Sequence, residues 1–242
     1  PWRSQHSRQH LVATASNLIH NYHGADAFTK QLNTLRLGMH RNCMDANDTR
    51  VCTHLALSPT AVYKKHNDLR MVRQIGGLYW NTTFCPMAVG DACTRKAIID
   101  AVLLGCIPVF FHRCQLLQWP WHIGGWLERA TLFYDMERVV GNRSRTPLDL
   151  VGELKRVPAR AVARMQRTIA EHAHCLHYAV TEPGFVPAAA ATRIGDVPGA
   201  FEIALQGAWR LSRNASIEAS HRPHLCRRVP IDKDSAATSL IG

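Results

Sequence analysis

The order of apolar and polar positions near the middle of the chain predicts a strand, a helix and a second strand. Residues 78–85 are rich in the strand formers Leu, Tyr, Trp, Thr and Phe. Residues 94–104 carry apolar side chains on one helical face and are followed by Gly105, which tolerates the left-handed backbone after a helix. Residues 107–111 are wholly apolar, as expected of a buried parallel strand. The pattern predicts a βαβ unit with a right-handed crossover.

The segments on either side predict further elements. Before the central unit, we expect helices at residues 11–19, 29–41 and 63–74, the last ended by Gly76 and Gly77, and a strand at residues 51–57. After it, helical periodicity covers residues 147–156, 158–178 and 197–211. The residues after about 221 resemble a disordered tail. The alternation predicts an α/β fold with a parallel sheet and a helical C-terminal part.

The composition is that of an ordinary globular protein. The 242 residues are 46% apolar and 19% charged, which is enough to bury a core. The longest apolar stretch, residues 97–111, is too short to span a bilayer. No signal-peptide pattern is present. The chain begins with Pro1 rather than Met, so we expect the natural N-terminus to lie upstream.

The net charge of +11 favours anionic partners, from nucleic acid and anionic lipid to phosphates and sugar phosphates. The basic residues are spread out, with modest clusters at residues 155–167 and 222–228. No basic run interleaves with aromatic residues in the way that single-strand binding requires. Solvated basic helix faces explain the charge better, and nucleic acid is not an expected partner.

Cysteines and glycosylation motifs bear on the compartment. None of the eight cysteines forms a CxxC pair, and their even number permits disulfides without showing them. Four Asn-x-Ser/Thr sequons begin at Asn47, Asn81, Asn142 and Asn214, where roughly one is expected by chance. These features favour the lumen of the secretory pathway.

The loop at residues 86–93 is the predicted binding site, because ligands of parallel α/β sheets bind outside the carboxyl ends of the strands. Gly90 lets the backbone approach a ligand. The next helix is expected to begin near Asp91–Thr94, with its N–H groups and the Thr94 hydroxyl suited to a phosphate. Arg95 and Lys96 stand where the helix dipole disfavours cations, which favours a diphosphate ligand.

Two further residues have functional and structural interpretations. Asp100 lies one helical turn deeper, where a carboxylate can accept hydrogen bonds from ribose, but it also stands four residues after Lys96 and can form an ion pair with it. His112 follows the second strand directly and faces the same crevice, where it can contact a sugar or a leaving phosphate. A histidine at a strand end is, however, more often structural.

Two other clusters are weaker candidates. Residues 118–122, Gln-Trp-Pro-Trp-His, can stack on sugars or bases, although a core plug beneath a long loop is the favoured interpretation. Residues 172–177 hold three histidines and Cys175 at helical spacing, which permits a metal site. No second ligand group stands at a matching spacing, so no metal is expected. The P-loop, GxSxG, HExxH and GxGxxG motifs do not occur.

The central segment resembles the exostosin-like glycosyltransferases, most closely their plant xyloglucan galactosyltransferase branch. The residues that carry the resemblance are Phe84, Cys85, Pro86, Gly90, Asp91, Thr94, Arg95, Lys96, Asp100 and the run from Gly105 to His112. Weaker matches are residues 118–122, the Leu154, Val157, Pro158 and Met165 pattern, residues 199–201, and upstream Arg36, Cys43 and Cys52. The resemblance covers about residues 30–212.

The resemblance implies a GT-B fold, in which two Rossmann-like domains face each other across a cleft. The C-terminal domain binds the nucleotide sugar, so that Gly90, Asp91, Thr94 and Arg95 are expected to contact the diphosphate and Asp100 the ribose. Such enzymes transfer a sugar, here expected from a UDP-linked donor, to a glycan or polysaccharide acceptor with inversion. They use no bound metal or cofactor.

Several residues depart from the family pattern: Ala92 replaces a Ser, Cys93 an aromatic residue, Lys96 an Arg, and Met87 with Ala88 a Gln-Pro pair. These changes leave the sugar open, and no general base can be placed. The alternative is a non-catalytic nucleotide-sugar-binding or partner module.

The domain division follows from the family's acceptor domain, which needs more than about 100 residues before Thr29. We expect residues 1–28 to be a linker or a remnant of that domain, residues 29–220 to bind the nucleotide sugar, and residues 221–242 to be a disordered tail. The full-length protein is expected in the Golgi lumen as a type II membrane protein, anchored by a segment outside this chain.

Overall fold

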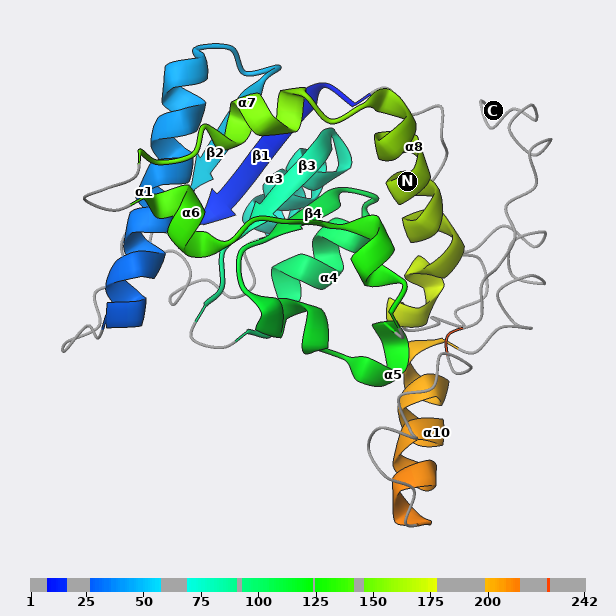
Figure 1. Ribbon diagram of the computed structural model, residues 1–242. Coiled ribbons are helices and arrows are strands. Elements are labelled where there is room, and N and C mark those ends of the chain that lie inside the picture. Colours follow the sequence, from blue (N-terminus) through cyan, green and yellow to red (C-terminus); the bar gives the residue numbers. More distant parts are fainter. Residues whose placement is uncertain are drawn as a thin grey trace, which may run out of the picture.

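Five parallel strands form one sheet in the order β2-β1-β3-β4-β5 (Figure 1). The computed structural model describes residues 8–16, 27–57, 69–90, 93–123, 125–141, 146–177, 199–213 and 226. The strands are β1 His10–Ser16, β2 Cys52–Ala56, β3 Thr82–Met87, β4 Ile107–Phe110 and β5 Leu132–Phe133. The predicted α/β fold with a parallel sheet and a helical C-terminal part is confirmed.

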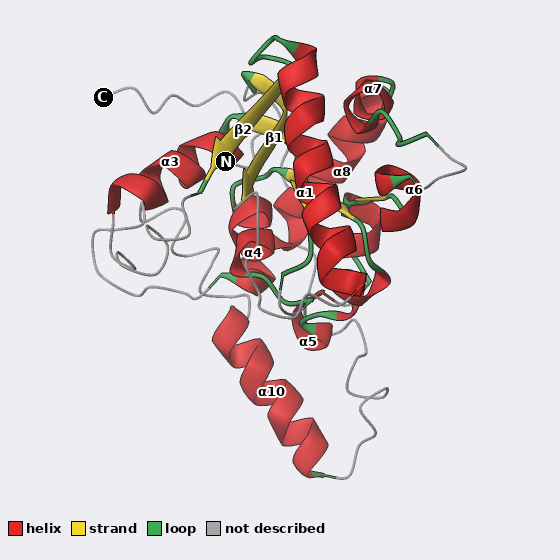
Figure 2. Ribbon diagram, turned by 90° about the vertical axis from the view of Figure 1, so that its left-hand side faces the viewer, coloured by secondary structure: helices red, strands yellow, loops and turns green. Residues whose placement is uncertain are grey.

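Helices cover both faces of the sheet (Figure 2). Helix α1 (Ala27–Ala46) leads from β1 to β2, whereas α3 (Leu69–Trp80) and α4 (Lys96–Leu103) lead to strands in the opposite direction along the sheet. Because such crossovers are right-handed, α1 lies on one face and α3 and α4 on the other. Helix α1 packs against α6 (Met136–Val140) and α7 (Leu150–Lys155), and α3 packs against α4.

The remaining described helices follow β4 and build the helical C-terminal part. They are η1 Arg113–Leu117, α5 Pro120–Ile123, η2 Leu127–Ala130, α8 Ala159–His172, η3 Ala173–Leu176 and α10 Ala200–Ser212. No helix in the described part of the chain is long and apolar enough to cross a membrane.

Strand β1 corrects the prediction of a helix at residues 11–19. It lies between β2 and β3, and every residue from Val12 to Ser16 is buried. A strand that is covered on both faces has no polar alternation, so its short apolar run cannot be told from a buried helix by periodicity. Residues 10–16 therefore belong to the sheet, although the sequence pattern places them in a linker.

Helix α3 corrects two further boundaries. It runs through Gly76 and Gly77, which were expected to end a helix, and it includes residues 78–80, which were expected to begin β3. Helical spacing instead turns Tyr79 inward, where its ring is buried. Residues 63–68 of the predicted helix lie outside the described residues.

Arg8 holds the ends of two helices against the sheet. Its Nη1 donates to the carbonyl oxygens of Tyr79, Trp80 and Thr82 at 2.8–3.1 Å, and its Nη2 donates to that of Leu104 at 3.2 Å. Burial lowers the pKa of Arg8 to about 10, so the guanidinium stays charged at neutral pH. It thus supplies donors for carbonyls that the helix ends leave unpaired.

All eight cysteines form disulfides, which an even count alone only permitted. The pairs are Cys43–Cys52, Cys85–Cys106, Cys93–Cys114 and Cys175–Cys226. The last pair bears on the predicted disordered tail, because Cys226 is buried and bonded to η3. The rest of residues 221–242 lies outside the described residues.

Helix α10 projects from one end of the sheet and is held by residues 121–122 (Figures 1 and 2). Trp121 lies on Gly207, where a β-carbon would overlap the indole ring. His122 Nε2 lies 2.9 Å from the Ala200 carbonyl oxygen, and burial lowers the pKa of His122. Trp121 is therefore half-buried beneath helix α10, whereas the sequence interpretation placed this segment as a core plug beneath a long loop.

The contact between α10 and Trp121 makes a testable prediction. A methyl group at Gly207 cannot fit, so Gly207→Ala is expected to lower the free energy of unfolding by about 1–3 kcal/mol. Gly76→Ala is the matched control, because a β-carbon there meets nothing within 4 Å and the position is inside α3. It is expected to raise the same free energy by about 0.5–1 kcal/mol. Urea unfolding measures both, and equal effects would contradict the contact.

Candidate functional site

The strand order places a switch point between β1 and β3. The connection from β1 runs to β2 on one side, and the next connection returns to β3 on the other side. Ligands of such sheets bind in the crevice outside the carboxyl ends of the two strands where the direction reverses. Ser16 ends β1 there, and the β3–α4 loop, described at residues 88–90 and 93–95, follows β3. The predicted loop is therefore at the expected edge.

Two arginines hold the first residues of the β3–α4 loop. Arg36 from α1, only 2% exposed, donates from Nη2 to the Val89 carbonyl oxygen at 3.1 Å. Arg95 donates from Nη1 to the Ala88 carbonyl oxygen at 2.6 Å. A β-carbon at Gly90 would lie 3.6 Å from Cδ of Arg95, so the structure brings these two predicted residues together. Two cations, one from α1 and one from the end of the loop, thus lie against the loop at the carboxyl edge of the sheet.

Helix α4 begins later than the sequence predicts. Its first residue is Lys96, with Arg95 at the N-cap, and no acidic residue stands in its first turn. Thr94 therefore precedes the helix, and its exposed hydroxyl donates to the Gln118 amide oxygen. The Gln118 amide nitrogen in turn donates to the Cys114 carbonyl oxygen at 2.9 Å. Asp91, the remaining predicted loop contact, lies outside the described residues.

Asp100 is engaged in the ion pair that was one of its two interpretations. Lys96 Nζ lies 2.6 and 2.7 Å from the two carboxylate oxygens, and the two side chains are 84% and 33% exposed. Such an exposed pair along a helix contributes about 0.3–0.5 kcal/mol. A ribose contact by Asp100 stays a prediction, and it would need this carboxylate to exchange partners.

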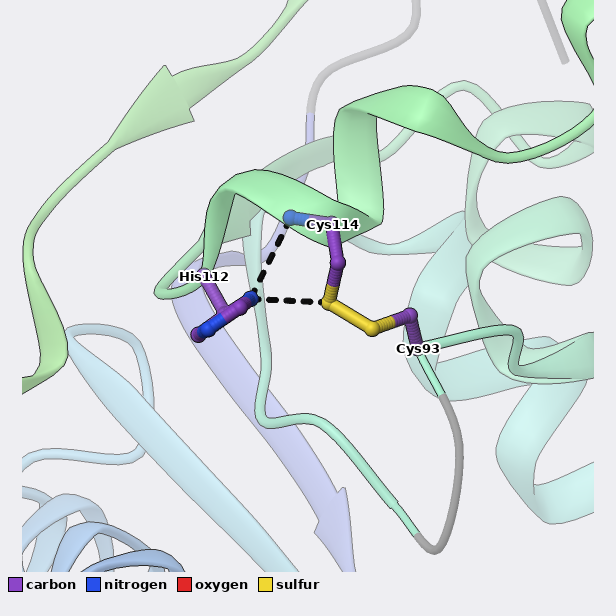
Figure 3. A group of neighbouring side chains, drawn as sticks. All are labelled: Cys93, His112 and Cys114. Atoms are coloured by element: carbon purple, nitrogen blue, oxygen red, sulfur yellow. Dashed lines mark hydrogen bonds between the residues drawn. A yellow bond between two sulfur atoms is a disulfide. The ribbon is translucent and has the colours of Figure 1, made fainter. Parts of the chain in front are cut away.

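His112 serves as the N-cap of η1 (Figure 3). Its Nδ1 accepts a hydrogen bond from the Cys114 backbone N–H at 3.2 Å and lies 2.8 Å from Cys114 Sγ. The ring is exposed at the end of β4, beside the disulfide that joins Cys93 of the loop to Cys114 of η1. The geometry gives His112 a structural role and keeps it at the predicted edge.

Gln115 is a residue of this edge that the sequence did not reveal. It is fully buried. Its Oε1 accepts from the backbone N–H groups of Phe111 and His112 at 3.0 and 3.2 Å, and its Nε2 donates to the Met87 carbonyl oxygen at 2.7 Å. One amide therefore joins the carboxyl ends of β3 and β4. A lone Gln after an apolar run carries no motif, so only the strand pairing exposes its role.

Two further properties of the described side chains bear on their chemistry: the pKa of Tyr79 and the spacing of possible metal ligands. Burial raises the pKa of Tyr79 to about 12, with Arg95 lowering and Asp100 raising it by their charges. Two groups of side chains have metal-ligand spacing: Cys93, His112 and Cys114, and His174, Cys175 and Cys226. In both groups the cysteines are disulfide-bonded, which leaves the imidazole as the only strong donor in this state.

Two half-buried imidazoles, those of His40 and His54, form a histidine layer on the α1 side of β1 and β2. Thr14 Oγ1 and His54 Nδ1 are 2.5 Å apart, and the rings of His40 and His54 meet edge to face with centroids 4.7 Å apart. Nε2 of His54 and Nδ1 of His40 are buried without a hydrogen bond among the described residues. Burial, followed by the charge of His40, lowers the pKa of His54 to about 4.

This histidine layer predicts a dependence of stability on pH. The pKa of His54 falls from 6.5 to about 4 on folding, so the folded state favours the neutral ring. The stabilisation is complete above pH 6.5, declines as the pH falls, and is lost once the pH passes 4; it amounts to at most about 3 kcal/mol. Urea unfolding between pH 7 and pH 4 should give a shallower decline for His54→Gln than for the wild type. Identical declines would contradict the assignment.

Comparison with known proteins identifies the family. The profile of the exostosin GT47 domain matches residues 3–135, which is more than half of the chain. The chain belongs to the exostosin GT47 domain family. The match includes β1 and the β3–α4 loop.

Curated relatives match this exostosin GT47 chain over short stretches. A probable xyloglucan galactosyltransferase of Arabidopsis thaliana (GT15) is 47% identical over 47 residues, which is 19% of this chain and 10% of the relative. A second one (GT19) is 30% identical over 94 residues, 37% of this chain and 20% of the relative. Xyloglucan galactosyltransferase MUR3 is 40% identical over 47 residues, 19% of this chain and 8% of the relative. The aligned stretches thus cover at most a fifth of these relatives.

Proposed function

We propose that this chain is the donor-binding domain of a glycosyltransferase. In this proposal it transfers a sugar from a nucleotide sugar, UDP-linked, to a glycan or polysaccharide acceptor with inversion at the anomeric carbon. The observation that carries the proposal is the β3–α4 loop of an exostosin GT47 domain, held at the carboxyl edge of the sheet by Arg36 and Arg95. The matched relatives are named as galactosyltransferases and, in one case, a xyloglucan-specific galacturonosyltransferase.

A diphosphate suits this edge for electrostatic reasons. Arg95 stands at the N-cap of α4, where the free N–H groups of the first turn also attract an anion. When the glycosidic bond to the donor breaks, negative charge develops on the departing phosphate oxygen. Hydrogen-bond donors that are already in place before the reaction stabilise that charge without reorganising. Here the donors belong to the β3–α4 loop and the start of α4, and buried Arg36 and Gln115 hold this loop and the strand end before it.

The contacts within the proposed site follow from the described geometry and the family pattern. Gly90 and Arg95 lie against each other at the loop, with Thr94 beside them, and we assign these residues and Asp91 to the diphosphate. Asp100 is assigned to the ribose and His112 to the sugar or its leaving phosphate. In this proposal no metal or cofactor takes part, and the acceptor and general base belong to a second domain of the GT-B arrangement.

The proposed compartment is the Golgi lumen, with the full-length protein anchored as a type II membrane protein. Four disulfides require an oxidising environment to persist. The sequon at Asn47 lies exposed in the turn between α1 and β2, where a glycan has room. Both observations support a luminal protein, and the family of plant polysaccharide transferases fits that setting.

Binding of UDP tests the donor assignment. Calorimetric titration should show binding, and Arg95→Ala should weaken it about tenfold or more, because a charge-assisted hydrogen bond contributes about 1.5–3 kcal/mol. Arg156→Ala is the matched control: it removes the same charge from α7, where Arg156 pairs with Glu153 at 2.7 Å, and it should leave affinity unchanged. Absence of binding at millimolar UDP would contradict the proposal.

A second measurement separates an enzyme from a non-catalytic nucleotide-sugar-binding module. The alternative is supported by Ala92, which stands where the family pattern has a Ser. Release of UDP from UDP-galactose, with or without a xyloglucan acceptor, would support turnover. Binding of UDP together with no release would support the binding module instead.

Gln115 makes a prediction about how the edge is positioned. In Gln115→Glu a carboxylate would face the Met87 carbonyl oxygen that now accepts a hydrogen bond at 2.7 Å, whereas the protonated acid could donate to it. UDP affinity of the variant should therefore rise as the pH falls from 8 to 5, relative to the wild type. Gln206→Glu, the same change at an exposed position of α10, should follow the wild type. Identical profiles for Gln115→Glu and wild type, with both folded, would contradict a positioning role.

A further inference from the structure

The four disulfides differ in their access to solvent. The cysteines of three pairs are buried, with exposed fractions of 7% or less: Cys43, Cys52, Cys85, Cys106, Cys175 and Cys226. Cys93 and Cys114 alone are partly exposed, and they lie at the carboxyl edge of the sheet (Figure 3). Because thiol–disulfide exchange requires access to a sulfur atom, this pair is the one that an external thiol can reach.

The two sulfur atoms of this pair also differ from each other. Nδ1 of His112 lies 2.8 Å from Sγ of Cys114, whereas Figure 3 shows the Cys93 sulfur on the far side of the bond from the imidazole. The Arg113 guanidinium lies over the Phe133 ring, 5.8 Å from its centroid, and Figure 3 shows the His112 imidazole beside the bond. An imidazolium beside a sulfur stabilises it as a thiolate, which makes that sulfur the better leaving group.

We propose that Cys93–Cys114 is a thiol–disulfide exchange site for a dithiol reductant, with a preferred direction of attack. A thiolate of the dithiol attacks Sγ of Cys93, and a new S–S bond forms as the Cys93–Cys114 bond breaks. The electron pair goes to Sγ of Cys114. Nδ1 of His112 takes a proton from solvent, gives up the hydrogen bond that it accepts from the Cys114 N–H, and donates to the new thiolate. The second thiol of the reductant is deprotonated and then attacks the reductant sulfur that is bonded to Cys93. This attack closes the external disulfide and releases Cys93. Two protein thiols and one external disulfide result.

Opening this bond would act directly on the β3–α4 loop. The disulfide links the loop covalently to η1, and the hydrogen bond from Thr94 links the loop to Gln118, the residue that follows η1. Arg36 and Arg95 would still hold Val89 and Ala88, but Cys93 would lose its covalent attachment to η1. A loss of UDP affinity on reduction rests on the proposed function, whereas the selective exchange itself does not.

The chain contains its own comparison for access. Nε2 of His174 lies 3.2 Å from Sγ of Cys175, so the Cys175–Cys226 pair also has an imidazole beside one sulfur. Its sulfurs belong to buried residues, with exposed fractions of 0% and 6%. If an imidazole beside one sulfur were sufficient for rapid exchange, both disulfides would open together. If access is also needed, only Cys93–Cys114 opens early.

Limited reduction with dithiothreitol, followed by alkylation and mass-spectrometric mapping of the whole chain, tests the proposal. Cys93 and Cys114 should be labelled about tenfold faster than any other pair. His112→Ala should slow their labelling several-fold, and the matched His174→Ala should leave it unchanged. Simultaneous opening of all four pairs, or earlier opening of another pair, would overturn the assignment.

The direction of attack is tested with a monothiol. Glutathione should form its mixed disulfide on Cys93 rather than on Cys114, because the Cys114 sulfur departs beside His112. Adduct formation mainly on Cys114 would overturn the role of His112. UDP titration of the reduced protein then separates the two proposals: selective opening without any UDP binding by the oxidised protein would refute the donor-binding proposal and leave the exchange site intact.

Discussion

The carboxyl ends of β3 and β4 impose the constraint on which the site depends. Both strands are buried almost throughout, so the backbone groups where they end need partners inside the protein. Gln115 supplies three of these hydrogen bonds with one amide, and Arg36 and Arg95 bind the carbonyl oxygens of the next two residues. The groups that complete the fold at this edge are therefore the same groups that shape the crevice.

The sequence predicted those parts of the fold whose residue pattern is typical of only one kind of element. The apolar run that forms β4, the helix before it, and Gly105 with a φ of 74° were all predicted. Strand β1 was not, because a strand covered on both faces lacks the alternation that separates strands from helices. The prediction that Gly76 and Gly77 end a helix was wrong for a different reason. Glycine weakens a helix by only about 1 kcal/mol, which tertiary packing around Tyr79 outweighs.

The candidate site was predictable in position more than in detail. A loop after a buried strand identifies the edge, and the structure brings Gly90 and Arg95 together there. Gln115 escaped because its function lies in hydrogen bonds to Met87 and Phe111, and Met87 lies 28 residues away in sequence. Disulfide pairing escaped likewise, since an even number of cysteines does not fix connectivity. Both depend on which strands are neighbours, a property that local pattern cannot supply.

The charge at the start of α4 connects the fold to its chemistry. A helix gains nothing from cations in its first turn, yet Arg95 and Lys96 stand there with no acidic residue beside them. Lys96 is paired with Asp100 one turn later, and Arg95 is turned back to the loop, where it donates to the carbonyl oxygen of Ala88. An anion at the crevice would be attracted both by these cations and by the N-terminus of α4. In the proposed function that anion is a diphosphate, whose negative charge increases as the sugar departs.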